Sequence, residues 1–400
     1  MIRGHAQPDI NLLWSAATEL KLYDEAETYF KDLLNAIHSA QKEIIFQVYI
    51  FKEDEAGVPV AKALVAAAKK GVFVQLLVDA IGSNELSADF LSMMRESGCR
   101  VYLYQPLSFW KLKSKRFWSR NHRKLVLIDQ EIAFLGGMNV EGRQLRKNLP
   151  EAYFDHAVQV KGPVVAKIES RTRAFVDRHL KVWRIFSGLK WPRRTSSRAA
   201  KQQDHIRRQR VAYVERDNFR YRTLMERTLV QALRDSRQSV IISAPYFFPG
   251  MNIYRHFRDA CERGVTVDLI LQGKTEFKLF QLASASLYPL LQRAGVRLHE
   301  YESGLLHSKA AVFDQNLSTV GSCNLDPLSF LVNLEANLWV DDQDFSQKLR
   351  KSLELAIEKD CCPIEVGFWE RLSFAKRWLS LLGYYFLRLF VGFFYPRYSR

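Results

Sequence analysis

The sequence predicts an α/β fold made of two related halves, each with a mostly parallel central sheet and flanking helices. Residues 57–79 and 250–272 share the same succession of a glycine, a helical stretch, a second glycine and a Val-rich apolar run, at a constant offset. Such self-similarity indicates an internal duplication. Strands alternate with helices in both halves, which is typical of βαβ units and of a parallel sheet.

The expected strands recur in the same order in each half. Residues 44–49 and 72–78 are apolar runs of strand length in the first half, and residues 240–242 and 265–271 correspond to them in the second. Few polar residues interrupt these runs, which predicts strands buried on both faces. A helix is expected before the first strand, at residues 26–39, where large apolar residues recur at helical spacing.

A strongly basic stretch separates the two halves. Residues 189–210 contain eight Lys or Arg and one Asp, with little apolar periodicity. This composition indicates a solvated, partly disordered linker or, alternatively, a basic strap on an anionic surface. We therefore expect a first half, a basic linker, a second half and a C-terminal tail, at residues 9–185, 186–210, 211–362 and 363–400.

The composition limits the class of protein and of partner. The chain has 400 residues, of which 48% are hydrophobic, so it is long enough for two packed cores. A charged fraction of 26% argues against a polytopic membrane protein. The net charge of +16 favours anionic partners, namely nucleic acid, phospholipid headgroups or another phosphate ester.

The cysteines and the N-terminus bear on the compartment. The cysteines show no CxxC pair and no Cys/His ligand spacing, which argues against a disulfide framework and a structural zinc and favours a reducing compartment. They are Cys99, Cys261, Cys323, Cys361 and Cys362. Residues 1–11 contain no apolar core of the signal-peptide type, so we expect no signal peptide.

A motif that occurs once in each half is expected to supply the catalytic residues. In both copies a Lys follows the His by two residues, and an Asp, a Gly and an Asn follow at identical spacing. The copies are His122, Lys124, Asp129 and Asn139, and His307, Lys309, Asp314 and Asn324. Because residues i and i+2 share one side of a strand, His and Lys can point at the same ligand.

These residue types suit the cleavage of a phosphodiester. Two lysines and two asparagines can stabilise the charge that grows on the non-bridging oxygens. One neutral imidazole can attack phosphorus and form a phospho-histidine. The other, protonated, can donate to the leaving alkoxide and later activate an incoming alcohol, tasks that suit an ordinary pKa of about 6.5. The chemistry needs no metal or other cofactor.

The remaining acids near the motifs and the remaining histidines are expected to have different roles. Asp155 and Glu335 follow the two motifs and are candidates to accept a hydrogen bond from imidazole Nδ1, although either can be an ordinary structural acid. Asp129 and Asp314 belong to the catalytic motif, and we interpret them as bracing it rather than contacting phosphate. The remaining histidines have no such context and are interpreted as structural or solvent-exposed: His5, His38, His156, His179, His205, His256 and His299.

At these motifs the chain resembles the phospholipase D superfamily, from about residue 11 to residue 358. Within it, the chain is most similar to the bacterial cardiolipin synthases of the B type, which lack the two N-terminal transmembrane helices of the main type. Residues 244–249, 324–329 and 333–337 support the resemblance. It implies that the two halves share one α/β/α fold, pack about a pseudo-twofold axis and bring both motifs into one cleft.

The resemblance also implies roles and an activity. His122 would be the nucleophile and His307 the general acid/base, with Asp155 and Glu335 as their orienting acids. The implied reaction transfers a phosphatidyl group to the glycerol headgroup of phosphatidylglycerol, giving cardiolipin; the donor is either phosphatidylglycerol or phosphatidylethanolamine. Gly137 departs from the family, which more often has Ser there, and this departure removes a hydroxyl near the phosphate.

Two segments are candidates for contact with a membrane. Residues 374–400 are rich in aromatic residues, with cations at both ends and an arginine interrupting the apolar run. A span needs about 20 mainly apolar residues, so this composition favours an amphipathic helix on an anionic membrane surface. A helix packed on the core and a spanning segment are the alternatives. Residues 109–120 interleave basic and aromatic side chains, which suits headgroups or single-stranded nucleic acid.

Two other functions compete with phosphatidyl transfer. A hydrolytic phospholipase D or a nuclease would use the same motif, but the aromatic tail has no purpose in a nuclease. A non-catalytic membrane scaffold would not need both sets of His, Lys and Asn. We therefore expect phospholipid substrates and an anionic membrane surface as partners, no nucleic acid, and a peripheral location on the cytoplasmic side of a bacterial inner membrane.

Overall fold

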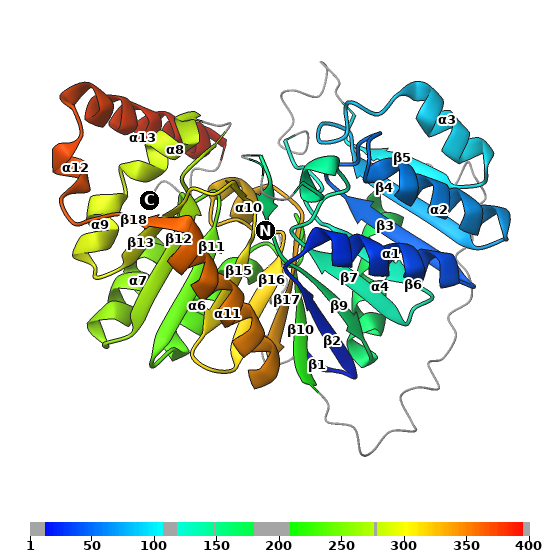
Figure 1. The fold of residues 1–400 in the computed structure, drawn as a ribbon, viewed down its shortest axis with the longest axis horizontal. Helices are drawn as coiled ribbons and strands as arrows, with labels where there is room; N and C mark the ends of the chain where they lie inside the picture. Colours follow the sequence, from blue (N-terminus) through cyan, green and yellow to red (C-terminus); the bar gives the residue numbers. More distant parts are fainter. Residues whose placement is uncertain are drawn as a thin grey trace, which may run out of the picture.

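Two β-sheets, one from each half of the chain, form the frame of the protein, with helices on their outer faces (Figure 1). The computed structural model describes residues 13–106, 118–146, 149, 151–179, 209–275 and 278–394. Most of the expected basic linker and the aromatic-basic segment at 107–117 therefore lie outside the described residues, as do the last six residues of the tail.

The sheet of the first half contains seven strands within the described residues. In spatial order these are β2 (Glu19–Tyr23), β9 (Ala157–Lys161), β7 (Ile132–Gly136), β6 (Leu125–Ile128), β3 (Glu43–Val48), β4 (Phe73–Asp79) and β5 (Arg100–Tyr104). The sheet of the second half repeats this order and adds one strand at each edge. Its strands are β1 (Trp14–Ala17), β10 (Gln209–Arg216), β17 (Glu335–Asp341), β16 (Leu317–Gly321), β15 (Ala310–Phe313), β11 (Ser239–Ala244), β12 (Thr266–Gln272), β13 (Arg297–Tyr301) and β18 (Cys361–Pro363).

The expected duplication and the strands named from the sequence agree with the structure, but the prediction of mostly parallel sheets is wrong. Both sheets are mixed, with parallel pairing along β3–β4–β5 and along β11–β12–β13 and antiparallel pairing across the rest of each sheet. Parallel pairing occurs where a helix provides the crossover. Each motif strand is instead joined to the next strand by a tight turn, such as the one at Asp129–Glu131 between β6 and β7, and a tight turn imposes antiparallel pairing.

Helices follow the strands in the same order in each half. In the first half they are α1 (Ala26–Ser39), α2 (Gly57–Lys69), α3 (Ala88–Glu96) and α4 (Pro163–His179). In the second they are α6 (Leu224–Asp235), α7 (Met251–Glu262), α8 (Lys278–Ala285), α9 (Tyr288–Arg293), α10 (Pro327–Leu331), α11 (Gln343–Asp360), α12 (Phe368–Arg371) and α13 (Phe374–Phe394). Among the described residues, none of these helices has the length and apolar character needed to cross a membrane.

A hydrophobic core shared by the two halves holds the sheets together. It combines buried side chains of β6, β7 and β9 with those of β15, β16 and β17, and α4 and α11 close its sides. The chain also crosses between the sheets, because β1 pairs with β10 of the second half while β2, which follows it, pairs with β9 of the first. This exchange fixes the two halves to one another.

The shared core predicts that both halves unfold together. Leu349 on α11 is fully buried in that core, whereas Leu355 on the same helix is 44% exposed. We expect Leu349→Ala to lower the free energy of unfolding by about 2–5 kcal/mol and Leu355→Ala to lower it by less than about 0.5 kcal/mol. Chemical denaturation followed by fluorescence checks this, and a second transition that appears only in Leu349→Ala would contradict the shared core.

Candidate active site

Both His–Lys pairs lie where the parallel strands of their half end. β6 begins at Leu125, directly after Lys124, and pairs antiparallel with β3, so that Gln47 at the C-terminal end of β3 lies opposite Leu125. In the second half Ala310, directly after Lys309, lies opposite Ser243 of β11 in the same way. The carboxyl ends of the parallel strands and the two motifs therefore share one edge of each sheet.

Each motif is bound through its backbone to the other half of the chain. The N–H of His122 donates to the carbonyl of Leu334 at 3.0 Å, and the N–H of His307 donates to the carbonyl of Phe154 at 2.9 Å. Around His307 this contact extends into a short parallel pair of strands, β8 (Tyr153–Phe154) with β14 (Leu305–Leu306). Leu334 and Phe154 directly precede the two candidate orienting acids, so the main chain of each half sets the position of the other half's imidazole.

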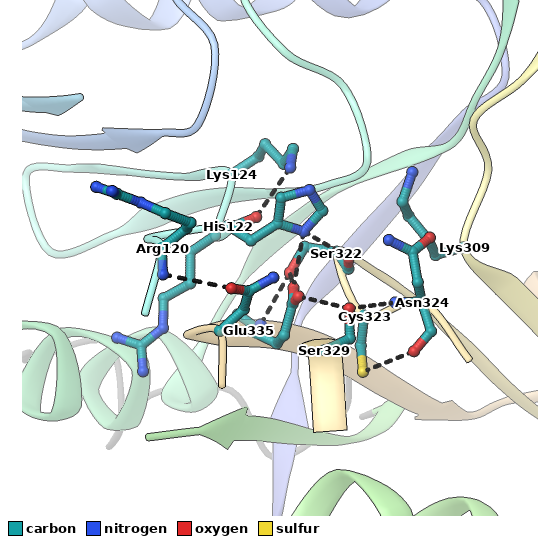
Figure 2. Close-up of polar contacts among 12 residues, drawn as sticks. Arg120, His122, Lys124, Lys309, Ser322, Cys323, Asn324, Ser329 and Glu335 are labelled. Atoms are coloured by element: carbon teal, nitrogen blue, oxygen red, sulfur yellow. Dashed lines mark hydrogen bonds and ion pairs between the residues drawn. The ribbon is translucent and has the colours of Figure 1, made fainter. Parts of the chain in front are cut away.

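The two acids contact the imidazoles crosswise. Nδ1 of His122 donates to Glu335 Oε2 at 3.1 Å, and Nδ1 of His307 donates to Asp155 Oδ2 at 2.6 Å (Figure 2 shows the first pair). Both carboxylates are buried. A carboxylate oxygen can only accept, so each imidazole carries its proton on Nδ1 and keeps the lone pair of Nε2 for chemistry. The sequence named both acids but not which histidine each one holds.

The surroundings of the two carboxylates differ. Glu335 accepts hydrogen bonds from the hydroxyl of Ser322 and, at 2.9 Å, from the hydroxyl of Ser329, as Figure 2 shows. Asp155 instead accepts the backbone N–H of His156 at 2.8 Å, and Gly137 stands where the second half has Ser322. The hydroxyl missing at Gly137 thus corresponds to one that binds an orienting carboxylate. Sequence reasoning placed it near phosphate because spacing does not show which way a side chain points.

Gly137 is required by close packing. A Cβ added there would lie closer to Asp155 Oδ1 than any normal contact permits, and one added at Gly136 would collide with the backbone of Ala157. These two glycines let β7 approach β9 and the carboxylate that orients His307.

The four basic groups of the motifs share one electrostatic environment. Burial and then the neighbouring Lys309 ammonium lower the pKa of Lys124 to about 7, and burial lowers the pKa of Lys309 to about 8. Burial and Lys309 lower the pKa of His307 to about 4, and burial lowers the pKa of His122 as well. Groups of both halves therefore act on one another within a single cluster whose charge favours an anion.

The carboxylates remain ionised despite their burial. Burial alone would raise the pKa of Asp155, but the His307 imidazole and the Lys309 ammonium hold it below its usual value. Burial would likewise raise the pKa of Glu335, but His122 and Lys124 hold it low. Each acid thus stays a hydrogen-bond acceptor for its imidazole across the neutral range.

The asparagines of the motifs are buried beside this cluster. Asn139 uses its side-chain oxygen to accept the N–H of Ile50 at 3.2 Å, and its Nδ2 makes no hydrogen bond to the described residues. A buried amide donor without a partner costs free energy, so an anionic oxygen placed against it would offset that cost. Asn324 is also buried, and its backbone N–H donates to Ser329 Oγ at 3.3 Å.

The structure places the aspartates of the motifs away from the imidazoles. Asp129 accepts the backbone N–H groups of residues 41–43 at 2.7–2.9 Å, and Asp314 accepts those of residues 237–239. Each follows the last residue of its motif strand, β6 or β15, and lies five residues after the motif lysine, which is about 16 Å at ~3.3 Å per strand residue. Their carboxylates tie the turn after each motif strand to the start of the neighbouring parallel strand.

Some side chains near the imidazoles gave no usable signal in the sequence. The ring of Tyr49 packs edge-on against His122 at 4.9 Å between centroids, and Tyr153 lies 5.0 Å from His307. His156, interpreted as structural or exposed, is fully buried, and its Nδ1 lies 2.7 Å from the hydroxyl of Ser308 between His307 and Lys309. Within the described residues, no cluster of three His, Cys, Asp or Glu side chains could hold a metal ion.

The duplicated α/β fold and the two His–Lys pairs in one cluster are those of phospholipase D-type enzymes. The family model described as cardiolipin synthase, PLD-like domain, matches residues 33–170 and 229–356, one match in each half. The chain therefore belongs to the cardiolipin synthase family of the phospholipase D superfamily.

Individual relatives agree with this assignment. The chain is 33% identical over 387 residues to cardiolipin synthase B of Salmonella typhi and to that of Escherichia coli (strain K12), covering 94% of this chain and 89% of each relative. It is 32% identical over 346 residues to cardiolipin synthase A of Pseudomonas fluorescens, covering 86% of this chain and 69% of that protein. The fold is similar to that of phosphatidylserine synthase from Haemophilus influenzae, with a TM-score of 0.69, 12% identity and coverage of 96% of both chains.

The close approach at Gly137 yields a testable consequence. We expect Gly137→Ala to displace Asp155 from His307 and to lower the turnover number between about 10- and 100-fold, because orienting partners of a catalytic side chain have effects of that size. Ser322→Ala, at the equivalent position of the second half, deletes one hydroxyl without adding an atom and should cost less. Product formation by the purified variants, with circular dichroism to confirm folding, measures both. Full activity of a folded Gly137→Ala protein would show that the contact is not needed.

Proposed function

We propose that the chain is a cardiolipin synthase that transfers a phosphatidyl group from one phospholipid to the glycerol headgroup of phosphatidylglycerol. The observation that carries the proposal is the pair of imidazoles, each held by a buried carboxylate of the other half, beside two buried lysines. Similarity to cardiolipin synthases over nearly the whole chain supports the lipid substrate.

The first step forms a covalent intermediate on His122. Its Nε2 lone pair attacks phosphorus, and the bond from phosphorus to the headgroup oxygen breaks. His307, protonated when the anionic substrate is bound, gives its proton to that oxygen, so that glycerol or ethanolamine leaves with a hydroxyl group and not as an alkoxide. The family resemblance supports the choice of His122 as the nucleophile.

The second step resolves the intermediate. His307, now neutral, takes the proton of a glycerol hydroxyl of phosphatidylglycerol, and the oxygen attacks the phosphorus on His122. The bond from phosphorus to nitrogen breaks, His122 regains its lone pair and cardiolipin leaves. Glu335 and Asp155 stabilise the positive charge that each imidazole carries in turn.

The basic side chains hold the phosphate throughout both steps. Lys124 and Lys309 neutralise charge on the non-bridging oxygens, and the amide of Asn139 donates to one of them. Asn324 takes the equivalent place in the second half. Asp129 and Asp314 keep the motif strands in register from the far end of β6 and β15. The reaction uses no cofactor.

The proposed working location is a membrane surface. The net charge of +16 favours anionic phospholipids. We expect a peripheral protein on the cytoplasmic side of a bacterial inner membrane, with halves at 9–185 and 211–362 carrying the chemistry. In this scheme the described part of the tail, which contains α12 and α13, lies near the anionic surface.

Lipid analysis tests the reaction directly. Cells that lack their own cardiolipin synthases should accumulate cardiolipin when they express this chain and none when they express His122→Ala, as measured by mass spectrometry of extracted lipids. His256→Ala, which alters a partly exposed histidine of α7, is the matched control and should behave as the parent does. A rise in phosphatidic acid without cardiolipin would identify a hydrolase, and cardiolipin made by His122→Ala would exclude His122 as the nucleophile.

The lysine pair predicts how phosphodiester binding depends on pH. An ammonium binds an anion only below its pKa, and the pKa values of Lys124 and Lys309 lie at about 7 and about 8. Binding should therefore weaken as pH rises from 7 to 9, by up to about tenfold per unit for each lysine that must be reprotonated. Competitive inhibition by glycerophosphoglycerol, whose charge is constant in this range, measures the effect. An inhibition constant that does not change between pH 7 and 9 would contradict it.

A further inference from the structure

Helix α13 presents its apolar side to solvent. Seven large apolar or aromatic side chains on it are between 49% and 74% exposed, namely Phe374, Trp378, Leu379, Leu382, Tyr385, Phe386 and Leu389. The side that faces the protein carries the small residues Ser380 and Gly383, both buried. A surface helix of a protein that meets only water has the opposite arrangement, and an exposed patch of this kind marks an interaction site.

Specific contacts fix this orientation. α13 packs along α8, and the small side chains at Ser380 and Gly383 allow the two helices to approach closely. The ring of Tyr384 lies 5.2 Å from that of Phe248. The guanidinium of Arg377 donates to the carbonyls of Leu372 and Glu370 at 2.9 and 3.0 Å, which ties the helix to the turn before it. The outward face is thus held outward by the fold.

The exposed face lies at the catalytic end of the second half. Phe248, which α13 contacts, follows β11, and α8 follows β12, both at the carboxyl ends of these parallel strands. Lys309 begins its motif strand at that same edge. Figure 1 shows α13 and α8 together beyond that edge of the second sheet. A surface that covered α13 would therefore also face the entrance to the site.

The chemistry of the face fits a lipid surface. α13 contains the cations Lys376, Arg377 and Arg388 and no acidic residue. Trp378 and Tyr385 combine an apolar ring with a polar atom, which suits the headgroup boundary of a bilayer. Cations beside an apolar, aromatic face favour a position in the plane of an anionic membrane.

We propose that the outward face of α13 inserts into the headgroup boundary of an anionic bilayer and so directs the catalytic end of the molecule toward its lipid substrates. This inference rests on the proposed function, because it takes a bilayer phospholipid as substrate. It deepens that function by assigning the docking surface and the orientation. A second copy of the chain is the competing occupant of the same face.

The test separates docking from chemistry. The full-length protein is compared with the double variant Leu382→Glu, Phe386→Glu and with Leu355→Glu, which places a single glutamate on an exposed leucine of α11. Co-sedimentation with vesicles of phosphatidylglycerol and phosphatidylethanolamine measures docking. Turnover of monomeric dihexanoyl phosphatidylglycerol measures the chemistry without a bilayer.

The double variant should bind vesicles at least tenfold more weakly than the parent, with turnover of the monomeric substrate unchanged, and Leu355→Glu should match the parent in both assays. Vesicle binding that survives in the double variant would overturn the proposal. The proposal would also be overturned if analytical ultracentrifugation showed that the parent is a dimer and the double variant a monomer, while both bind vesicles. Loss of monomeric turnover in the double variant alone would also overturn it, because α13 would then be part of the cleft. A parent that turns over no monomeric substrate, yet binds vesicles through α13, would instead refute the proposed function.

Discussion

Glu335 and Asp155 each accept a hydrogen bond from an imidazole that belongs to the opposite half of the chain, at 3.1 and 2.6 Å. Neither half can orient its own histidine, so the site exists only while the two sheets keep their relative position. The shared core of β7, β16 and β17 with α4 and α11 supplies that position, and the crossing of the chain between β1 and β2 reinforces it. The catalytic geometry consequently depends on the stability of the interface between the two halves.

The same requirement explains why a cluster that is costly by itself is tolerated. Two buried lysines and two largely buried imidazoles lie together. Burial lowers the pKa of both lysines, and the charge of Lys309 lowers that of Lys124 further. Burying charge costs free energy unless partners offset it. Glu335 and Asp155 provide the negative charge, and each lysine donates to the carbonyl of its own motif histidine. The cluster is thereby arranged before an anion arrives, and a phosphodiester restores the favourable charge state of the lysines.

Much of this arrangement could be read from the sequence because it depends on local spacing. The duplication, the strand positions and the residues of both motifs follow from repeated patterns and from the two-residue period of a strand. The mixed sheets did not follow, since the direction of β7 depends on the tight turn after Ile128, which the alternation of strands and helices does not reveal. The sequence also did not show which histidine each carboxylate contacts. Nothing local to Asp155 shows that it contacts His307, 152 residues away, rather than His122. The hydrogen bond from Ser329 to Glu335 and the close packing of Asp155 against Gly137 are likewise tertiary contacts, which a sequence pattern does not reveal.

The two halves have kept the fold but not identical surroundings for their carboxylates. Glu335 shares its charge with two serine hydroxyls, whereas Asp155 is shorter, accepts one backbone N–H and lies against a glycine. Hydrogen bonds to a carboxylate reduce its pull on the imidazole proton, so the two histidines face unequal acceptors although their motifs are alike. In the proposed two-step transfer one imidazole bonds to phosphorus while the other moves a proton, so unequal acceptors suit the unequal roles of the two histidines. The residues beside the carboxylates, Gly137 in one half and Ser329 in the other, thus make the two halves of this duplicated site chemically different.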